Sequence, residues 1–209
     1  TAQVTFDSQG GGPGPSQSVI IAGQDVANEG NVQGVTFTAA VGETPATLEL
    51  NNVSCAGTPY GEGEGAGMAG IQISGFDNFN IIVSGTNTIG PGGPGSVGIL
   101  MRGGNLTIGG TGSIDITGES GIWMDGFTDA RTLTFIGSLT ADINYLRLEP
   151  NSEGNQTVAF FNDSVNVTLN QSAESLAGRF TKATTAQVTF DSQGGGPGPS
   201  QSVIIAGQD

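Results

Sequence analysis

The chain has 209 residues, which is enough for one large domain or two small ones. Glycine contributes 37 residues, charged residues make up only 11%, and the formal net charge is −14 at pH 7. This acidity excludes nucleic acids and anionic lipid surfaces as partners, because both require a cationic face. The chain has no histidine and a single cysteine, Cys55, which excludes histidine-based catalysis and an internal disulfide. No run approaches the ~18 apolar residues of a membrane-spanning helix, so we expect no membrane insertion.

Short runs typical of β-strands follow one another along the chain, separated by Gly, Asn, Asp and Pro. Most of them alternate apolar and polar residues, as half-buried strands do. We expect strands at 3–6, 18–21, 34–39, 46–50, 70–74, 79–85, 98–101, 105–108, 113–117, 121–124, 132–137, 145–148, 157–161 and 165–169. Only 171–182 has a helical pattern, of two turns at most, with Ser172 as its N-cap. The sequence therefore predicts an all-β fold.

Four of these runs, GIQI, GILM, GIWM and YLRL, share one pattern: large apolar residues stand at their second and fourth positions, and the first three runs begin with glycine. They begin at residues 70, 98, 121 and 145, at spacings of 28, 23 and 24 residues, and further short strands follow each of them. This recurrence is typical of a β-solenoid, in which coils of two or three strands stack with parallel pairing. We therefore expect coils of about 24 residues, with Gly98 and Gly121 at corners that need a positive φ or a close backbone approach. A β-sandwich completed by a donated strand is the alternative, because it has a similar strand count and alternation.

The most regular stretch is 97–126, VGILMRGGNLTIGGTGSIDITGESGIWMDG. It resembles the coils of right-handed parallel β-helix proteins from bacterial surfaces, among them carbohydrate-binding β-helix modules. The resemblance extends loosely over 70–170, whereas residues 1–60 depart from it. It implies a right-handed parallel β-helix, an extracellular or cell-surface location, contact with glycans and bound calcium. It carries no individual site residue over to this chain.

Residues 185–209 repeat residues 1–25 without a difference, at an offset of 184 residues. The chain therefore divides into one unit, 1–184, and a copy of its beginning, 185–209. Three explanations fit: a tandem array of near-identical units, a C-terminal copy added to supply a strand that a neighbour normally provides, or an artefact of cloning. Long extracellular fibres and adhesins are typical settings for such arrays.

The duplicated segment predicts strand exchange between units, since an exposed sheet edge accepts an extended strand through main-chain hydrogen bonds. We expect one copy to dock onto the body formed by 26–184 and the other to meet the same surface of a neighbouring molecule. The docking residues of the second copy are Val188, Phe190, Val203 and Ile205, and those of the first copy, directed at the neighbour, are Val4, Phe6, Val19 and Ile21.

Individual side chains raise four further kinds of site for consideration. Oxygen ligands suit calcium, and acids in presumed turns are its candidates: Glu62, Glu64, Asp125 and Asp129. Asp115, Asp125, Asp129 and Asp142 are candidates for hydrolytic carboxylates, but solvated surface acids are the better interpretation. Trp123 and Tyr145 lie in successive presumed coils and are candidates for stacking on sugar rings, against core packing as the alternative. The glycosylation candidates are Asn52, Asn105, Asn155, Asn162, Asn166 and Asn170, each of which begins an N-x-S/T motif.

These features favour a structural subunit of an extracellular tandem-repeat or polymerising fibre or adhesin, linked head to tail to copies of itself. The alternative is a calcium-assisted carbohydrate-binding module on the cell surface, with a polysaccharide as partner. We expect no enzymatic activity.

Overall fold

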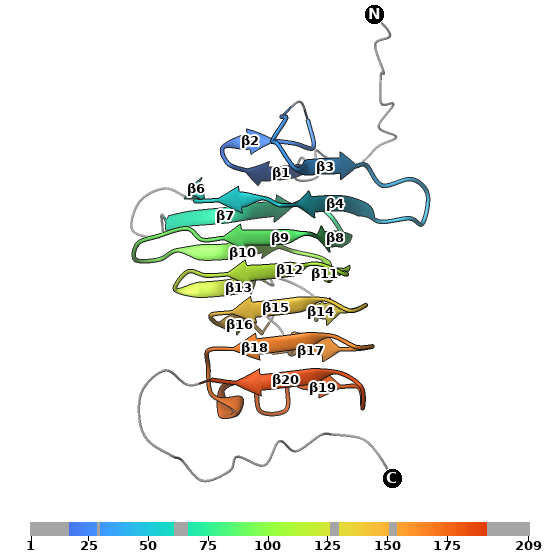
Figure 1. The fold of residues 1–209 in the computed structure, drawn as a ribbon, viewed down its shortest axis with the longest axis vertical. Helices are drawn as coiled ribbons and strands as arrows, with labels where there is room; N and C mark the ends of the chain where they lie inside the picture. Colours follow the sequence, from blue (N-terminus) through green and yellow to red (C-terminus); the bar gives the residue numbers. More distant parts are fainter. Residues whose placement is uncertain (1–16, 29, 61–66, 126–129, 151–153, 192–209) are drawn as a thin grey trace, which may run out of the picture.

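The computed structural model describes residues 17–28, 30–60, 67–125, 130–150 and 154–191. It is all-β, with strands that run across the longest axis and stack level upon level along it (Figure 1). Neighbouring levels pair in parallel through the middle of the molecule. The all-β solenoid expected from the sequence is therefore confirmed, and the β-sandwich alternative is wrong. Within these ranges no helix is long and apolar enough to cross a membrane.

Each complete coil gives one strand to each of three sheets. Sheet 1 contains β7, β10, β13 and β16, sheet 2 contains β8, β11, β14 and β17, and sheet 3 contains β9, β12, β15 and β18. The bounds are β7 Gly67–Ser74, β8 Asn78–Ser84, β9 Thr86–Ile89, β10 Val97–Arg102, β11 Asn105–Gly110, β12 Ser113–Ile116, β13 Ser120–Asp125, β14 Thr132–Phe135, β15 Thr140–Ile143, β16 Leu146–Leu148, β17 Val158–Phe161 and β18 Asn166–Leu169.

The register in sheet 1 follows the predicted repeat. Ile71 lies beside Ile99 and Ile99 beside Ile122, which in turn pairs with Leu146. The spacings of 28, 23 and 24 residues are therefore the lengths of successive coils. Stacking places residues of the same kind above one another, so the inward positions form continuous ladders.

These ladders make up the core. In sheet 3, Ile89, Ile116, Ile143 and Leu169 lie in one fully buried column. In sheet 2 the rings of Phe135 and Phe161 stack with their centroids 5.0 Å apart. A buried polar residue, Asn87, interrupts the apolar interior, and its amide group bonds to the main chain of Val53, Ser84 and Ser113. Its polar atoms therefore have partners that replace water.

Gly98 and Gly121 allow neighbouring coils to approach closely, although each is the second residue of a strand, β10 or β13, rather than a corner residue as predicted. A Cβ atom on Gly98 would lie 2.5 Å from the carbonyl oxygen of Gly121 in the next coil, and one on Gly121 would lie 3.0 Å from the carbonyl oxygen of Ile116 in the preceding coil. Neither glycine has a positive φ. Of the two reasons predicted for these glycines, close approach is confirmed and positive φ is wrong.

The N-terminal end is built differently from the coils. β1 (Ser18–Ile21) pairs antiparallel with β7 and with β2 (Gln24–Asp25), and β3 (Val35–Thr38) pairs antiparallel with β4 (Ala46–Asn51). β5 (Ser54–Cys55) extends sheet 3, and β6 (Thr58–Tyr60) pairs antiparallel with β7. The antiparallel pairing of β1, β2, β3 and β6 distinguishes the described part of residues 17–60 from the coil pattern.

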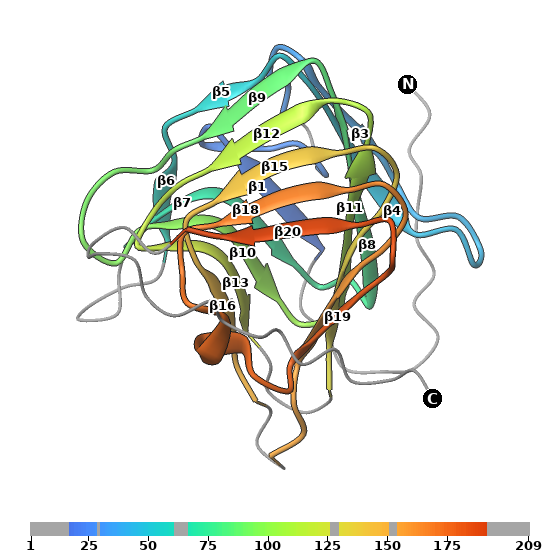
Figure 2. The same cartoon turned by 60° about the horizontal axis from the view of Figure 1, so that its bottom comes forward.

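The C-terminal end continues the parallel stacking. β19 (Phe180–Lys182) extends sheet 2 and β20 (Gln187–Phe190) extends sheet 3, so they form the last level among the described residues (Figure 2). In sheet 1 this level is occupied by a 3-10 turn, η2 (Ala173–Leu176), beside β16. The helix predicted over 171–182 is therefore wrong: one short turn forms, and 180–182 is a strand because Phe180 packs against the core ring of Phe161.

Candidate functional site

The first copy of the duplicated segment closes the N-terminal end of its own chain. β1 pairs with β7 from Ser18 opposite Ser74 to Ile21 opposite Ile71. Val19 and Ile21 are fully buried in the main core. The segment 18–21 was expected to meet a neighbouring molecule, and the structure corrects this expectation. Burial of two large apolar side chains holds the segment against its own β7.

The second copy closes the C-terminal end. β20 pairs with β18, with Val188 opposite Val167 and Phe190 opposite Leu169. Both β20 side chains are half-buried and pack against the core, and the ring of Phe190 lies 5.8 Å from that of Phe180. The structure thus places 187–190 beside β18 on the body of the chain.

The described portions of the two copies are different halves of the same sequence. In the first copy the structure describes the half that contains Val19 and Ile21, and Val4 and Phe6 lie outside the described residues. In the second copy it describes the half that contains Val188 and Phe190, whereas Val203 and Ile205 lie outside. Each end of the solenoid is therefore completed by a different half of one 25-residue sequence.

A second feature is the outer face of sheet 1. Leu100, Trp123 and Arg147 lie side by side on successive strands. Leu100 is buried beneath Tyr60, whose ring meets the indole of Trp123 edge-on at 6.4 Å. The guanidinium group of Arg147 covers the indole at 4.1 Å from its centre, a cation–π contact. Trp123 is therefore a packed, half-buried ring, and this favours core packing over sugar stacking for it.

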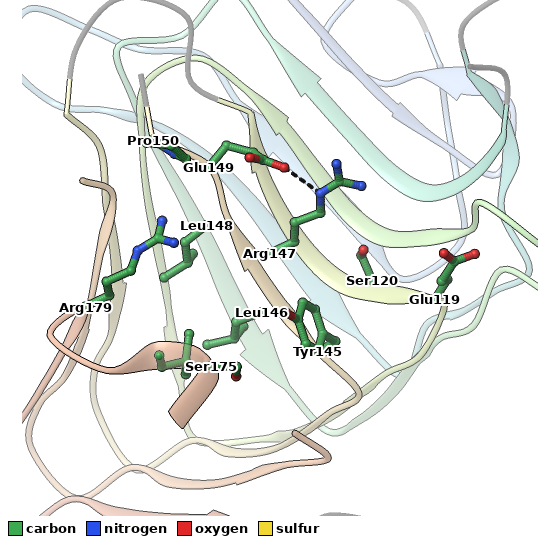
Figure 3. Close-up of a pocket in the computed structure, with 11 residues that line it drawn as sticks. Glu119, Ser120, Tyr145, Leu146, Arg147, Leu148, Glu149, Pro150, Ser175 and Arg179 are labelled. Atoms are coloured by element: carbon green, nitrogen blue, oxygen red, sulfur yellow. Dashed lines mark hydrogen bonds and ion pairs between the residues drawn. The ribbon is translucent and has the colours of Figure 1, made fainter. Parts of the chain in front are cut away.

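Tyr145, by contrast, lines an open pocket of about 440 Å³ between β16 and η2 (Figure 3). Its side chain is 37% exposed. The other lining residues are Glu119, Ser120, Leu146, Arg147, Leu148, Glu149, Pro150, Ser175, Leu176 and Arg179.

The charged groups of the pocket are held by neighbouring polar groups. Arg147 and Glu149 form an ion pair at 2.6 Å, and Nε of Arg179 donates to the carbonyl oxygen of Thr157 at 3.4 Å. Burial lowers the pKa of Arg179, an effect that the nearby Glu149 opposes. The pocket thus combines one exposed ring with charged hydrogen-bonding groups.

The acids proposed as calcium ligands are not brought together in the described structure. Asp125 lies beside Arg102 on the neighbouring strand, and burial raises the pKa of Asp125 while Arg102 opposes the rise. Glu62, Glu64 and Asp129 lie outside the described residues. Among the residues that the structure describes, no three acids or cysteines form a group able to hold a metal ion. Calcium binding stays a prediction.

Two other acids do meet, on the outside of sheet 3. Asp115 of β12 and Asp142 of β15 lie directly opposite each other. Burial and then the charge of Asp142 raise the pKa of Asp115. Asp142 also accepts a hydrogen bond from the amide of Asn170 at 3.3 Å. Thr88 and Thr168 lie in the same row of side chains as the two aspartates. This part of the outer face of sheet 3 is therefore a polar surface.

The glycosylation candidates differ in accessibility. Asn52, Asn155 and Asn166 are exposed, and Asn162 is half-buried. The amide nitrogen of Asn105 donates to Oδ1 of Asn78 at 3.0 Å, that of Asn170 to Oδ1 of Asp142 at 3.3 Å, and that of Asn52 to Oδ1 of Asn51 at 2.9 Å. Modification of all six residues stays a prediction.

Sequence reasoning found Tyr145 but missed the rest of the pocket. Arg147 and Glu149 flank inward-facing leucines, so their outward position follows from strand alternation. Arg179 follows η2, where the sequence suggested a continuing helix. Its approach to β16 depends on the stacking of successive coils, which no local pattern specifies.

No protein-family model, no curated protein and no solved structure matches this chain.

Proposed function

We propose that this chain is a structural subunit of an extracellular fibre, joined head to tail to copies of itself. One observation carries the proposal: a 25-residue sequence present at both ends of the chain supplies β1 at one end and β20 at the other. One half of this sequence completes the C-terminal end of a unit, and its other half completes the N-terminal end. A segment that lies between two consecutive units would do both. The acidic composition supports the same function, because net charge keeps a long assembly soluble.

The two ends of the solenoid also leave similar apolar groups incompletely covered. At the C-terminal end Phe180, Val188 and Phe190 are half-buried against the core. At the N-terminal end Val35 and Phe37 are half-buried against it. A copy stacked end to end would continue the core ladders and remove these side chains from water. Such a contact joins two unlike surfaces, so it builds an open filament rather than a closed dimer.

Electron microscopy of the producing cells tests this function. Antibodies against the chain are expected to label filaments on the cell surface. Diffraction from the isolated filaments is expected to show an axial spacing of ~4.8 Å, because the strands lie across the long axis. Label confined to the cell interior, or filaments without this spacing, would contradict the proposal.

Carbohydrate binding at the pocket beside β16 is the second candidate function, favoured by the exposed ring of Tyr145 among charged hydrogen-bonding groups. Aromatic rings stack on the apolar faces of sugars, and the charged groups can bond to hydroxyls. A glycan array probed with the native chain and with Tyr145→Ala tests it. We expect at least tenfold weaker binding by the variant, because the exposed ring is the stacking surface.

The control is Tyr60→Phe, which keeps the buried ring that covers Leu100 on the outer face of sheet 1, outside the pocket. It should bind as the native chain does. Repeating the array with a chelator separates a calcium-assisted site from a metal-independent one. If native chain and Tyr145→Ala bind equally, the pocket has no such role.

A further inference from the structure

We infer that the edge of β18, which β20 occupies in this chain, is the acceptor site for residues 3–6 of the next copy in the assembly. The inference rests on the proposed function and specifies its junction. It assigns the two halves of the duplicated sequence to different units: residues 1–7 complete the preceding unit, and the half that begins at Ser18 stays with its own.

The acceptor site is defined by main-chain hydrogen bonds. Four residue pairs align β20 with β18, from Gln187 opposite Asn166 to Phe190 opposite Leu169. At its two ends, the Gln187 amide donates to the carbonyl oxygen of Val165, and the Asp191 amide donates to that of Leu169, each at 2.8 Å. Any extended strand can form main-chain hydrogen bonds of this kind, provided that its side chains fit the surface beneath them.

The side chains that fit this site are present twice in the chain. Ala186 is 1% exposed, Val188 and Phe190 pack against the core, and the Thr185 hydroxyl donates to the carbonyl oxygen of Asp163. Residues 1–7 have the same sequence as 185–191, so they carry all of these groups in the same order. The acceptor site therefore has two chemically identical candidates, one from each copy of the segment.

The other half of the first copy is held by its own unit. Val19 and Ile21 are fully buried, and Oδ1 of Asp25 accepts a hydrogen bond from the amide of Val19 at 3.1 Å. The β1–β2 hairpin therefore fixes Ser18 at the N-terminal end of the solenoid. Residues 7–17 connect this hairpin to residues 3–6, and eleven extended residues reach at most ~37 Å. That length is ample to bridge two units stacked end to end, so residues 3–6 of the next copy can reach the acceptor site.

In a free chain the site is filled by 187–190 of the same molecule. In the assembly residues 3–6 of the next copy take that place, and the same contacts form between two molecules. This is a domain swap, in which an identical element is exchanged between copies at little cost in contacts.

Two full-length chains test the exchange. The acceptor carries Val4→Ser, Phe6→Ser, Val188→Ser and Phe190→Ser, so that both of its copies of the strand are weakened. The donor is the native chain, whose residues 3–6 are intact. Sedimentation velocity of the mixture, followed through a dye on the acceptor, is expected to show the acceptor sedimenting together with the donor. A donor with Val4→Ser and Phe6→Ser is the matched control, and its binding should be at least tenfold weaker.

Equal binding by the native and the control donor, or no binding by either, would overturn the inference. Circular dichroism checks that the acceptor retains its strands. A milder acceptor, with Phe6→Ala and Phe190→Ala, replaces it if it does not fold, and the same difference between donors is expected. The result is independent of filament labelling on cells. Strand exchange without surface filaments would refute the proposed function alone, and filaments without strand exchange would refute this inference alone.

Discussion

Replacing Val19 and Ile21 by serine is expected to destabilise the protein by about 5 kcal/mol, a large fraction of the stability of an ordinary domain. Both side chains are fully buried in the core, where they connect β1 to β7. Serine would lose the apolar contacts of Val19 and Ile21, and it would place hydroxyl groups among apolar side chains of the core. Thermal unfolding followed by circular dichroism should show a midpoint lower by roughly 10–20 °C.

The chain contains its own matched control for this experiment. Val203 and Ile205 have the same neighbours in sequence as Val19 and Ile21. Serine at Val203 and Ile205 is expected to leave the unfolding temperature of the monomer unchanged, because β1 already occupies the edge of β7. If the two double variants unfold at the same temperature, the two copies have equivalent roles and the division of the segment is wrong.

Gly98→Val is expected to destabilise the protein by about 3 kcal/mol, because the side chain has no space. Its Cβ would lie 2.4 Å from Cγ2 of Ile116 and 2.5 Å from the carbonyl oxygen of Gly121. A side chain can turn aside, but the carbonyl belongs to the next coil and moves only if the coils separate. The unfolding midpoint should fall by roughly 6–12 °C, as measured by calorimetry.

Gly92→Val is the control for this substitution. A Cβ on Gly92 would have no atom within 4 Å, and its φ is not positive. Its unfolding temperature should stay close to that of the native chain, within about 0.5 kcal/mol of stability. A native-like midpoint for Gly98→Val would mean that adjacent coils are more loosely packed at this position than the structure shows.

The sequence predicted the middle of the solenoid well, because there each coil repeats one local pattern. Inward isoleucines alternate with outward polar residues, and a glycine near the start of a sheet 1 strand recurs at Gly98 and Gly121. β9 and β15 escaped prediction for a local reason. Their inward positions include Asn87 and Ala141, one polar and one small, so the expected alternation of apolar residues is hidden.

The ends were harder to predict, because alternation does not encode strand direction. Ser18–Ile21 has the same pattern in an antiparallel pair as in a parallel one, and only its packing on β7 decides between them. The pocket was harder still. Tyr145 was identifiable as an aromatic residue in a coil, but Arg179 reaches the same space from the following coil, after a turn that resembled a helix. Proximity of this kind follows from stacking, which is non-local.

The strands of this molecule lie across its long axis, and this orientation determines how a fibre of such units would respond to force. Tension along the axis pulls directly on the hydrogen bonds between one level and the next, and it loads them a level at a time. Bending instead compresses one sheet while it stretches another, so all three sheets share the load. If the proposed filament forms, it would therefore resist bending more than axial pulling, and strong pulling would separate its levels.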